Sequence, residues 1–551
     1  MLHWKISKGS FQYFNRTFER PLGLTELGFY WDGNFNGTAD IIQHTIVAIE
    51  DPRLVGVHNV TRTWIALKRQ FPMLGSYISD NRRGKDGVTF VVEEDRLGVC
   101  SPDEIKFQVI SSLQEAQGFV NKVVNGKRSL SNALLARLFI LTRTDDKSHV
   151  HVLIHIAHCI TDGMANTSLL KHFLDILSSP SSHQSWIIEE RLALAMASED
   201  LVPKINNKAR QRWYRAIGCI LASLRTEQIT GGHTLPRRIT RQTLHTPARS
   251  ATIMTSFSTR DSAFIMHHCR KYGITFGNAL PVLSQVALTR VLCRLFVSGH
   301  ISDSEWEYRK REPMTTGGPL NLRPYLNQEW FGRGGFENVS LAISFFFHTL
   351  PFMPLGSATG IRPGDPVPAF GHLLTQGRFL LRCNMIKQQA QRSVQHPRFL
   401  EILGARAQTR VNRLKGATMQ WKSSGHSVLD LRNISVKDQG IVHGPVLSHG
   451  GSSLGNIDSF LPRDYPILRG TRDLRKLHLV SSHTTLHCRP GELYLGAATA
   501  SQQLHLSVYW DVNTYEEVTV SEWLKEIKAA IQFYLVSNGS GDSTWEAQAR
   551  L

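Results

Sequence analysis

The stretch His151-Val-Leu-Ile-His-Ile-Ala-His158-Cys-Ile-Thr-Asp162-Gly163-Met-Ala-Asn-Thr-Ser-Leu-Leu-Lys-His-Phe-Leu-Asp-Ile-Leu177 contains two different periodicities. Residues 151–157 are mostly apolar and β-branched, which predicts a buried strand at 149–156. Residues 164–177 place leucine and phenylalanine at helical spacing, which predicts an amphipathic helix. The segment is therefore expected to be a strand-to-helix turn, and Gly163 could adopt the backbone angles that a tight turn requires.

His158 and Asp162 are the candidate catalytic residues of this turn. A neutral imidazole can take the proton of an alcohol as the alcohol attacks an acyl carbonyl, which typically contributes ~10²–10⁴ in rate. Asp162 would either hold the imidazole or tie the turn to a distant arginine. A His-x-x-x-Asp-Gly string alone is a weak signal, and its position between a strand and a helix strengthens it.

Four other segments accompany this motif in a fixed order. They are Thr63-Trp-Ile-Ala-Leu-Lys-Arg-Gln-Phe-Pro-Met-Leu74, Tyr272-Gly-Ile-Thr-Phe-Gly-Asn-Ala-Leu-Pro-Val-Leu283, Gly318-Pro-Leu-Asn-Leu-Arg323-Pro and Ser452-Ser-Leu-Gly-Asn-Ile-Asp458. Together with the His158–Gly163 motif, the series resembles the chloramphenicol acetyltransferase-like superfamily over residues 10–535. That group includes plant acyltransferases of the BAHD type, peptide-synthetase condensation domains and fungal O-acetyltransferases. The plant Asp-Phe-Gly-Trp-Gly pentapeptide is absent, and the sequence most resembles fungal trichothecene 15-O-acetyltransferases and their relatives.

This resemblance implies an α/β fold of two lobes, each a mixed sheet with flanking helices, and an active-site channel between them. It implies an acyltransferase in which His158 is the general base, acetyl-CoA is the co-substrate and no covalent intermediate forms. The acceptor would be a hydroxyl of a secondary metabolite, such as a terpenoid. Asp162 would pair with an arginine, for which Arg323 is the candidate, and Gly163 would form the turn. The resemblance identifies no CoA-contacting residue, bound cofactor or metal ligand.

Three regions are expected along the chain: a first lobe at 1–215, a basic crossover linker at 216–250 and a second lobe at 251–551. Within the first lobe, the Gly/Asn-rich run Trp31-Asp-Gly-Asn-Phe-Asn-Gly37 predicts a turn or loop. Further segments with helical or strand patterns are expected at 61–71, 87–92, 253–257, 260–272, 276–297, 370–415, 474–481, 492–500, 503–510 and 520–536.

The composition favours a soluble intracellular protein. Hydrophobic residues make up 41% of the chain, which suffices for a large core. Seven scattered cysteines without a Cys-x-x-Cys pair predict free thiols in a reducing compartment. The N-terminal residues lack the apolar region of a signal peptide, and the most apolar helix, 274–297, is interrupted by proline and arginine. We expect a cytoplasmic monomer with no membrane partner.

The formal net charge is +18, and two segments concentrate it. Residues 204–249 contain ten Lys/Arg and a single acidic residue, Glu227. Residues 378–415 contain nine Lys/Arg and a single acidic residue, Glu401. These runs could attract the phosphates of CoA or an acidic surface, or they could form a solvated basic face. Neither run has the pattern of a nucleic-acid-binding module, so no nucleic-acid partner is expected.

Other constellations are weaker. His151, His155 and His158 have helical metal-ligand spacing, but a strand would place His158 on the opposite face from the other two, so no zinc site is expected. Gly450-Gly-Ser-Ser453-Leu resembles the serine motif of carrier proteins, which requires a helical bundle that this region does not predict. Trp510-Asp-Val-Asn-Thr-Tyr515 is interpreted as a strand end and turn. Two alternatives remain for the whole chain: a condensation-type catalyst with a carrier-bound acyl donor, and a non-catalytic binding protein that retains the fold.

Overall fold

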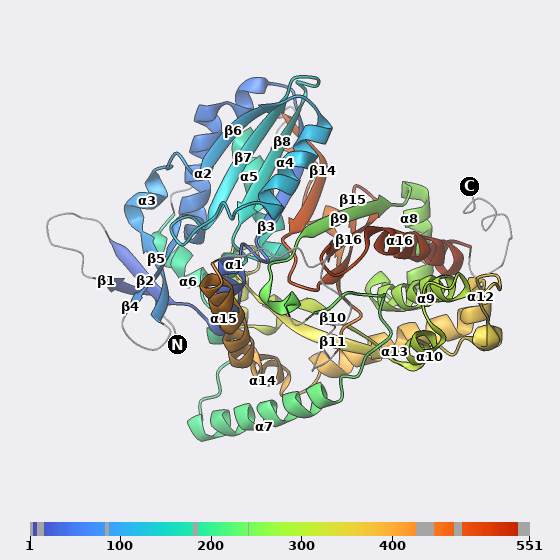
Figure 1. Cartoon of the computed structure of the whole chain (residues 1–551). Coiled ribbons are helices and arrows are strands. Elements are labelled where there is room, and N and C mark those ends of the chain that lie inside the picture. The colour runs from blue at the N-terminus through green and yellow to red at the C-terminus, as the bar shows by residue number, and fades with distance from the viewer. Residues whose placement is uncertain are drawn as a thin grey trace.

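The structure, a computed structural model, describes residues 4–7, 16–82, 87–179, 186–240, 242–425, 446–467 and 476–537. Strands in these residues form two mixed six-stranded sheets and one four-stranded antiparallel sheet. The six-stranded sheets belong to two lobes, each covered by helices (Figure 1). The predicted two-lobed α/β architecture is confirmed. The small sheet consists of β1 (Lys5–Ser7), β2 (Thr17–Pro21), β5 (Gly87–Glu93) and β4 (Tyr77–Arg82).

The sheet of the first lobe has the strand order β13-β14-β3-β8-β7-β6. Its strands in chain order are β3 (Ile41–Ile49), β6 (Ile105–Ile110), β7 (Ala136–Arg143), β8 (His149–Ile156), β13 (Asp464–Tyr465) and β14 (Leu477–Leu486). The central strand β8 has the predicted bounds and is buried from Val150 to its end. Helices cover both faces of this sheet, which explains why the strand is a nearly continuous apolar run.

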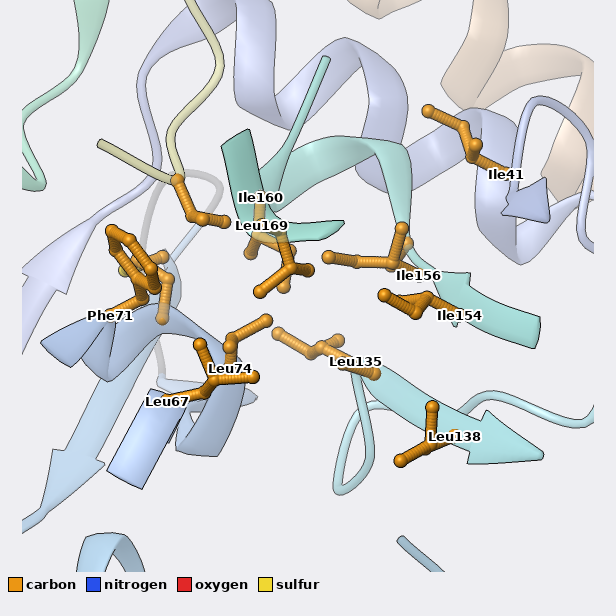
Figure 2. Close-up of a cluster of buried hydrophobic side chains, with 14 of the residues drawn as sticks. Ile41, Leu67, Phe71, Leu74, Leu135, Leu138, Ile154, Ile156, Ile160 and Leu169 are labelled. Carbon is orange, nitrogen blue, oxygen red and sulfur yellow. The ribbon is translucent and has the colours of Figure 1, made fainter. Parts of the chain in front are cut away.

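Helices α2 (Val57–Gln70) and α5 (Gly163–Ser178) pack together on one face of the first sheet, and α4 (Leu113–Asn125) packs on the other. Figure 2 shows Leu67 and Phe71 near Leu135, Ile160 and Leu169 in the core under the turn that follows β8. Side chains of the segment Phe71-Pro-Met-Leu74, which directly follows α2, are buried in the same cluster. This core fixes the position of the turn because its apolar residues pack directly before and after it.

The sheet of the second lobe has the order β11-β10-β12-β15-β16-β9. Its strands in chain order are β9 (Ser250–Ser256), β10 (Met314–Asn321), β11 (Ile343–Leu350), β12 (His449–Asn456), β15 (Leu493–Ala500) and β16 (Gln503–Asp511). Helices α8 (Thr259–Lys271), α9 (Phe276–Val297), α13 (Gln376–Val394) and α16 (Glu517–Ile531) surround the core of this lobe. Helix α9 alone among the described helices has the length and hydropathy of a membrane span, and 72% of its most apolar window is buried in this core.

The shorter and peripheral helices complete the fold. They are α1 (Leu24–Asn34), α3 (Glu94–Gly98), α6 (Ile188–Leu194), α7 (Lys208–Glu227), α10 (Asp303–Arg311), α11 (Gln328–Trp330), α12 (Phe370–Leu373), α14 (Phe399–Gly404) and α15 (Ala407–Ser423). Helices α12 to α15 fulfil the helical expectation for 370–415. Helix α7 runs through residue 215, where the sequence predicted the end of the first lobe and the start of a linker.

The chain of the second lobe also enters the first lobe, which departs from the predicted division at 251–551. Strand β14 pairs antiparallel with β3 from Leu477↔Ile49 to Leu486↔Ile41, and β13 extends the same sheet. The next strand, β15, returns to the second sheet. The strand predicted at 474–481 is confirmed from Leu477 onward, and residues 474 and 475 lie outside the described residues. The periodicity does not reveal which sheet the strand joins, because its pairing partner lies more than 400 residues away.

The prediction of a turn or loop at Trp31–Gly37 is wrong for the first half of this segment. Helix α1 continues through Trp31 to Asn34, and the left-handed turn begins only at Asn36 and Gly37. The large side chains of α1 are buried in the first core, and the helix packs against α15. Tertiary packing therefore overrides the weak helix propensity of the Asp-Gly-Asn sequence.

Candidate active site

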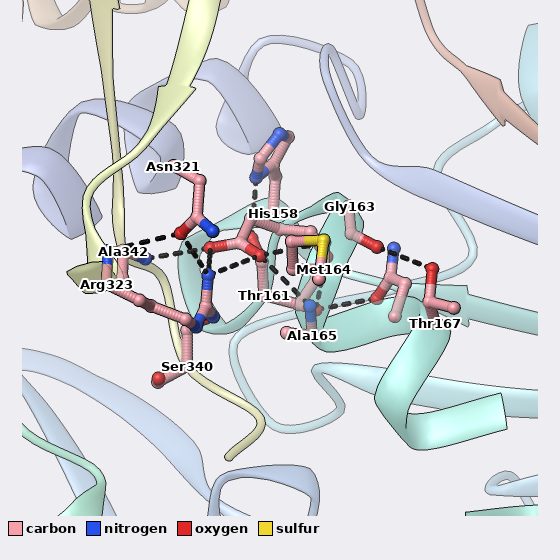
Figure 3. A network of polar contacts seen from close by, with 12 residues as sticks. His158, Thr161, Gly163, Met164, Ala165, Thr167, Asn321, Arg323, Ser340 and Ala342 are labelled. Carbon is pink, nitrogen blue, oxygen red and sulfur yellow. Dashed lines mark hydrogen bonds and ion pairs between the residues drawn. The ribbon is translucent and has the colours of Figure 1, made fainter. Parts of the chain in front are cut away.

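The motif forms a tight turn between β8 and α5. β8 ends at Ile156, a short 3₁₀ turn covers His158–Ile160, and α5 begins at Gly163 with Asp162 as its N-cap. Residues on both sides of His158 are buried, whereas His158 itself is partly exposed. The turn therefore presents one imidazole from an otherwise closed core (Figure 3).

The hydrogen bonding of His158 defines its neutral tautomer. Its Nδ1 lies 2.8 Å from the backbone oxygen of Thr161. A carbonyl oxygen can only accept, so Nδ1 carries the proton and Nε2 carries the lone pair. None of the described residues hydrogen bonds to Nε2, which leaves that atom available as a base.

Electrostatics hold His158 in its neutral form. Burial, reinforced by the positive charge of Arg489, lowers the pKa of His158 to about 4. A base with this pKa is deprotonated throughout the neutral pH range. The imidazole is thus ready to accept a proton without first losing one.

Phe29 of α1 supports the imidazole of His158 from one side. The two rings are stacked, with centroids 3.9 Å apart and an interplanar angle of 18°. The guanidinium of Arg410 lies 4.5 Å from the centroid of Phe29, and that of Arg489 lies 5.5 Å from it. Phe29 therefore restricts the rotation of His158 and is itself in contact with two cations.

Asp162 holds the turn and does not contact the imidazole nitrogens. Its Oδ1 accepts hydrogen bonds from the backbone nitrogens of Met164 and Ala165, at 3.1 and 3.0 Å, as an N-cap does. Its Oδ2 accepts from the backbone nitrogen of Ala342 at 2.8 Å. Of the two roles considered for Asp162, the geometry supports the structural one.

Arg323, the candidate partner, lies beside Asp162. Its Nη1 is 2.9 Å from Oδ2 of Asp162, and both side chains are at most 1% exposed. Its Nη2 donates to the backbone oxygen of Ser340 at 2.8 Å. Arg323 follows β10, and Ser340 and Ala342 precede β11, so this buried pair attaches the His158 turn to the second lobe.

Gly163 does not have the role that the sequence suggested. It is the first residue of α5 and has no positive φ. A Cβ at this position would meet only Leu454 Cδ2, at the ordinary contact distance of 3.8 Å. The turn is closed by the capping carboxylate of Asp162, so special backbone angles at Gly163 are not required.

A second buried aspartate lies on the Phe29 side of His158. Oδ2 of Asp32 accepts from Nη2 of Arg410 at 3.0 Å and from Nη2 of Arg489 at 2.9 Å. Asp32 belongs to α1, Arg410 to α15, and Arg489 follows β14. This cluster was not predicted from the sequence, because Asp32 was assigned to a predicted loop and Arg410 was one charge in a basic run. Arg489 also pairs with Glu492 at 3.5 Å, and the guanidinium of Arg413 interacts with both Asp32 and Arg489. Three cations therefore face two carboxylates, and the surplus positive charge raises the electrostatic potential near His158.

The histidines before the motif have structural partners. Nδ1 of His151 lies 2.8 Å from Nε2 of His44, and Nδ1 of His155 lies 2.9 Å from Oγ of Ser129. Burial lowers the pKa of His151 to about 4 and that of His155 to about 3. In the part of the chain that the structure describes, no group of three or more His, Cys, Asp or Glu side chains is arranged to hold a metal.

Ser453 also belongs to a Gly451-Ser-Ser-Leu-Gly455 sequence, which has the Gly-x-Ser-x-Gly spacing of a serine nucleophile. That nucleophile requires a sharp strand-to-helix turn, whereas Ser453 lies inside β12. The segment is not a carrier-type helical bundle either. Downstream, Asp458 accepts from the backbone nitrogens of Ser501 and Gln502, at 2.7 and 2.8 Å, and fixes the β15–β16 turn.

The interpretation of Trp510–Tyr515 as a strand end and turn agrees with the structure. β16 ends at Asp511, whose carboxylate accepts from the backbone nitrogens of Gly491 and Asn513 at 2.8 and 3.0 Å. This carboxylate is buried and its hydrogen bonds organise the turn.

Comparison with solved structures agrees with the fold. The trichothecene 15-O-acetyltransferase of Fusarium sporotrichioides has 15% identity and a TM-score of 0.66, with 96% of this chain and 97% of that chain covered. The condensation domain of the monacolin K polyketide synthase has 9% identity and a TM-score of 0.57, covering 94% and 97%. The epimerization domain from the third module of tyrocidine synthetase B has 11% identity and a TM-score of 0.52, covering 94% and 98%.

No family model and no curated protein sequence matches the chain. The structural likeness nevertheless extends over nearly the whole chain, which confirms the predicted resemblance at the level of the fold. The chain therefore has the two-lobed fold shared by an acetyltransferase and by condensation domains.

Proposed function

We propose that this protein is an O-acyltransferase in which His158 is the general base. One observation carries the proposal: a neutral, partly exposed imidazole has its Nδ1 proton committed to the Thr161 carbonyl and its Nε2 lone pair free. The likeness to the fold of the trichothecene 15-O-acetyltransferase supports this choice of reaction.

In the proposed reaction, Nε2 of His158 takes the hydroxyl proton as the alcohol oxygen attacks the thioester carbonyl of the donor. A tetrahedral oxyanion forms and collapses, which breaks the carbon–sulfur bond. The thiolate then takes the proton from the imidazolium, and the products are an ester and a free thiol. The hydrogen bond from Nδ1 to Thr161 favours the imidazolium while it exists, and no covalent bond to the protein forms.

The proposed donor is acetyl-CoA and the proposed acceptor is a terpenoid alcohol, with no bound cofactor or metal. The basic run at 378–415 supports an anionic donor, because its member Arg410 lies beside Phe29 instead of forming part of a solvated face. The acceptor class is taken from the trichothecene 15-O-acetyltransferase of similar fold. A condensation reaction with a carrier-bound donor is the alternative, since condensation domains have this fold as well.

The test is an assay of CoA release with acetyl-CoA and a panel of hydroxylated sesquiterpenes. His158→Ala should lower the rate by ~10²–10⁴ and leave the fold intact, because only the proton acceptor is removed. His149→Ala, at the opposite end of β8 with a side chain bonded to Asp146, is the matched control and should stay within a few-fold of the wild type.

A His158→Ala variant that retains activity within a few-fold would overturn the assignment of the base. If the wild type transfers acyl groups only from a carrier-bound thioester and not from acetyl-CoA, the condensation alternative is correct.

A further inference from the structure

Helix α7 (Lys208–Glu227) has apolar residues on two opposite faces. One face packs on α14, and its Gly218 approaches that helix so closely that a Cβ would lie 2.8 Å from Glu401 Cβ. The opposite face exposes Trp213, Ile220 and Leu224 to 64%, 61% and 49%. The inner face accounts for the packing of α7 in the fold, and the outer face takes no part in it.

The exposed residues form one continuous stripe. Positions seven and four residues apart on an α-helix point in nearly the same direction, so Trp213, Ile220 and Leu224 lie within about 40° of one another around the axis. Helix α7 lies at the edge of the molecule, below α14 and α15 in Figure 1. Isolated exposed apolar residues are ordinary, whereas an aligned tryptophan, isoleucine and leucine on a peripheral helix mark an interaction surface.

The surroundings of the stripe are strongly basic. Helix α7 contains five Lys/Arg, and its single acid, Glu227, is its last residue. By helical rotation, Arg210 and Arg212 lie on the two borders of the stripe, about 60° and 100° from its middle, and both are exposed. Arg398, whose guanidinium stacks on Tyr214, and Arg406, which donates to Thr226, instead hold α7 against the supporting helices.

We propose that the outer face of α7 docks this protein onto an anionic lipid surface. The Trp213–Leu224 stripe would enter the boundary between headgroups and acyl chains, and the bordering cations would contact lipid phosphates. Charge complementarity favours this partner over a protein surface, because a protein partner would need a matching acidic rim around an apolar groove. The docking is peripheral, since the five Lys/Arg of α7 prevent it from spanning a bilayer.

The inference revises the expectation of no membrane partner, which rested on the lack of a long apolar segment. A span is recognised by continuous hydrophobicity. An interfacial helix is recognised by an apolar stripe with a cationic border, and only the structure shows which stripe of α7 faces outward.

Cys219 provides a probe on the same helix. Among the seven cysteines, only Cys219 is exposed, and five are buried. The remaining one, Cys100, is partly exposed, but burial raises the pKa of its thiol to about 11, so Cys100 reacts less readily than an ordinary thiol. The full-length protein is labelled at Cys219 with an environment-sensitive fluorophore. It is then mixed with vesicles of phosphatidylcholine alone or of phosphatidylcholine with phosphatidylserine, and flotation measures binding independently.

The wild type should float with the anionic vesicles, with a blue-shifted label, and should bind neutral vesicles weakly. Trp213→Ser/Ile220→Ser/Leu224→Ser should lower partitioning by about ten-fold or more. Arg210→Glu/Arg212→Glu should remove the preference for anionic lipid. The matched control is Val109→Ser/Leu381→Ser/Val518→Ser, which removes three equally exposed but scattered apolar side chains and should bind like the wild type. Unchanged acyl-transfer rates in solution would show that each variant is folded.

Three results would overturn the proposal. They are no flotation of the wild type with anionic vesicles, equal binding of the stripe variant, and equal binding to neutral and anionic vesicles. A stripe variant that instead changes the molecular mass measured by light scattering without vesicles would assign the face to a second copy of the chain.

Discussion

Two buried aspartates flank His158, the proposed base, and both pair with arginines from the second half of the chain. Asp162 meets one arginine, Arg323, and both are fully enclosed, with the remaining acceptor capacity taken by backbone nitrogens. Asp32 meets two arginines at one oxygen, and Arg410 and Arg489 keep 19% and 31% of their side chains exposed. The first site is electrically balanced and closed, whereas the second is cationic and partly open.

The same residue types thus perform different tasks in the two places. A balanced, saturated pair fixes geometry, because each of its bonds joins the turn to another segment of the backbone. A cluster with surplus positive charge creates a positive electrostatic potential, which acts on neighbouring groups and lowers the pKa of His158. The comparison predicts that changes at Asp162 affect mainly stability and that changes around Asp32 affect mainly the electrostatics of catalysis.

The largest expected effect is on stability at Asp162. Asp162→Asn should lower the free energy of unfolding by ~3–5 kcal/mol, because it leaves the enclosed Arg323 without its counter-ion. Asp32→Asn should cost less, ~1–3 kcal/mol, because Arg410 and Arg489 reach solvent and Arg489 keeps Glu492 at 3.5 Å. Denaturant unfolding of both variants measures the difference, and equal losses would remove the distinction between the two sites.

The next effect is on the pH dependence of transfer. Because Arg489 contributes to the low pKa of His158, Arg489→Gln should raise that pKa and move the acid limb of kcat/KM to higher pH. Arg489→Lys keeps the charge and should leave the limb nearly in place. A limb that does not move in Arg489→Gln would show that burial alone sets the pKa.

Acid stability must be followed in the same experiment. His151, His155 and His158 have pKa values lowered from 6.5 to about 4, 3 and 4, so the unfolded chain binds more protons than the folded chain below pH ~6.5. The free energy of unfolding should therefore fall as the pH drops from about 6.5 towards 4. Thermal unfolding at each pH separates this loss from the titration of the base, and a flat profile over this interval would contradict the lowered pKa values.

A smaller effect is expected from salt. The apparent affinity for acetyl-CoA should fall as ionic strength rises, since screening reduces the reach of the open cationic cluster, while the affinity for a neutral alcohol should hardly change. Arg413→Gln, on the exposed side of α15, should raise the KM for acetyl-CoA roughly two- to five-fold. The control is Arg238→Gln in the linker, where the arginine already pairs with Glu516. Indifference to salt and to Arg413→Gln would leave the basic runs as a solvated face.

No effect is expected from removal of metals. His158 supplies the base in the proposed reaction, so dialysis against EDTA should leave the rate of acyl transfer unchanged. A rate that collapses and returns with added zinc would overturn the proposed mechanism and the role of the free Nε2.

Much of the first lobe and half of the site could be predicted. The bounds of β8 and α9 and the position of the turn follow from local periodicity, and the family resemblance, through the segment Gly318–Pro324, implied Arg323 as the partner of Asp162. The part of the site around Asp32 was missed, because its segment was predicted to be a loop. Trp31–Asn34 has the composition of a turn, yet it is helical because α1 is buried against the core and α15.

Apart from the end of α1, the sequence by itself determined the main elements, the turn that carries His158 and the capping of α5 by Asp162. These depend on residues within one or two turns of each other, so a short stretch contains all the information. Only the tertiary structure decided that β14 joins the first sheet, that Phe29 stacks on His158 and that Asp32 meets Arg410 and Arg489. Asp32 and Arg410 are 378 positions apart, and no local pattern encodes a contact that exists only when two helices pack together.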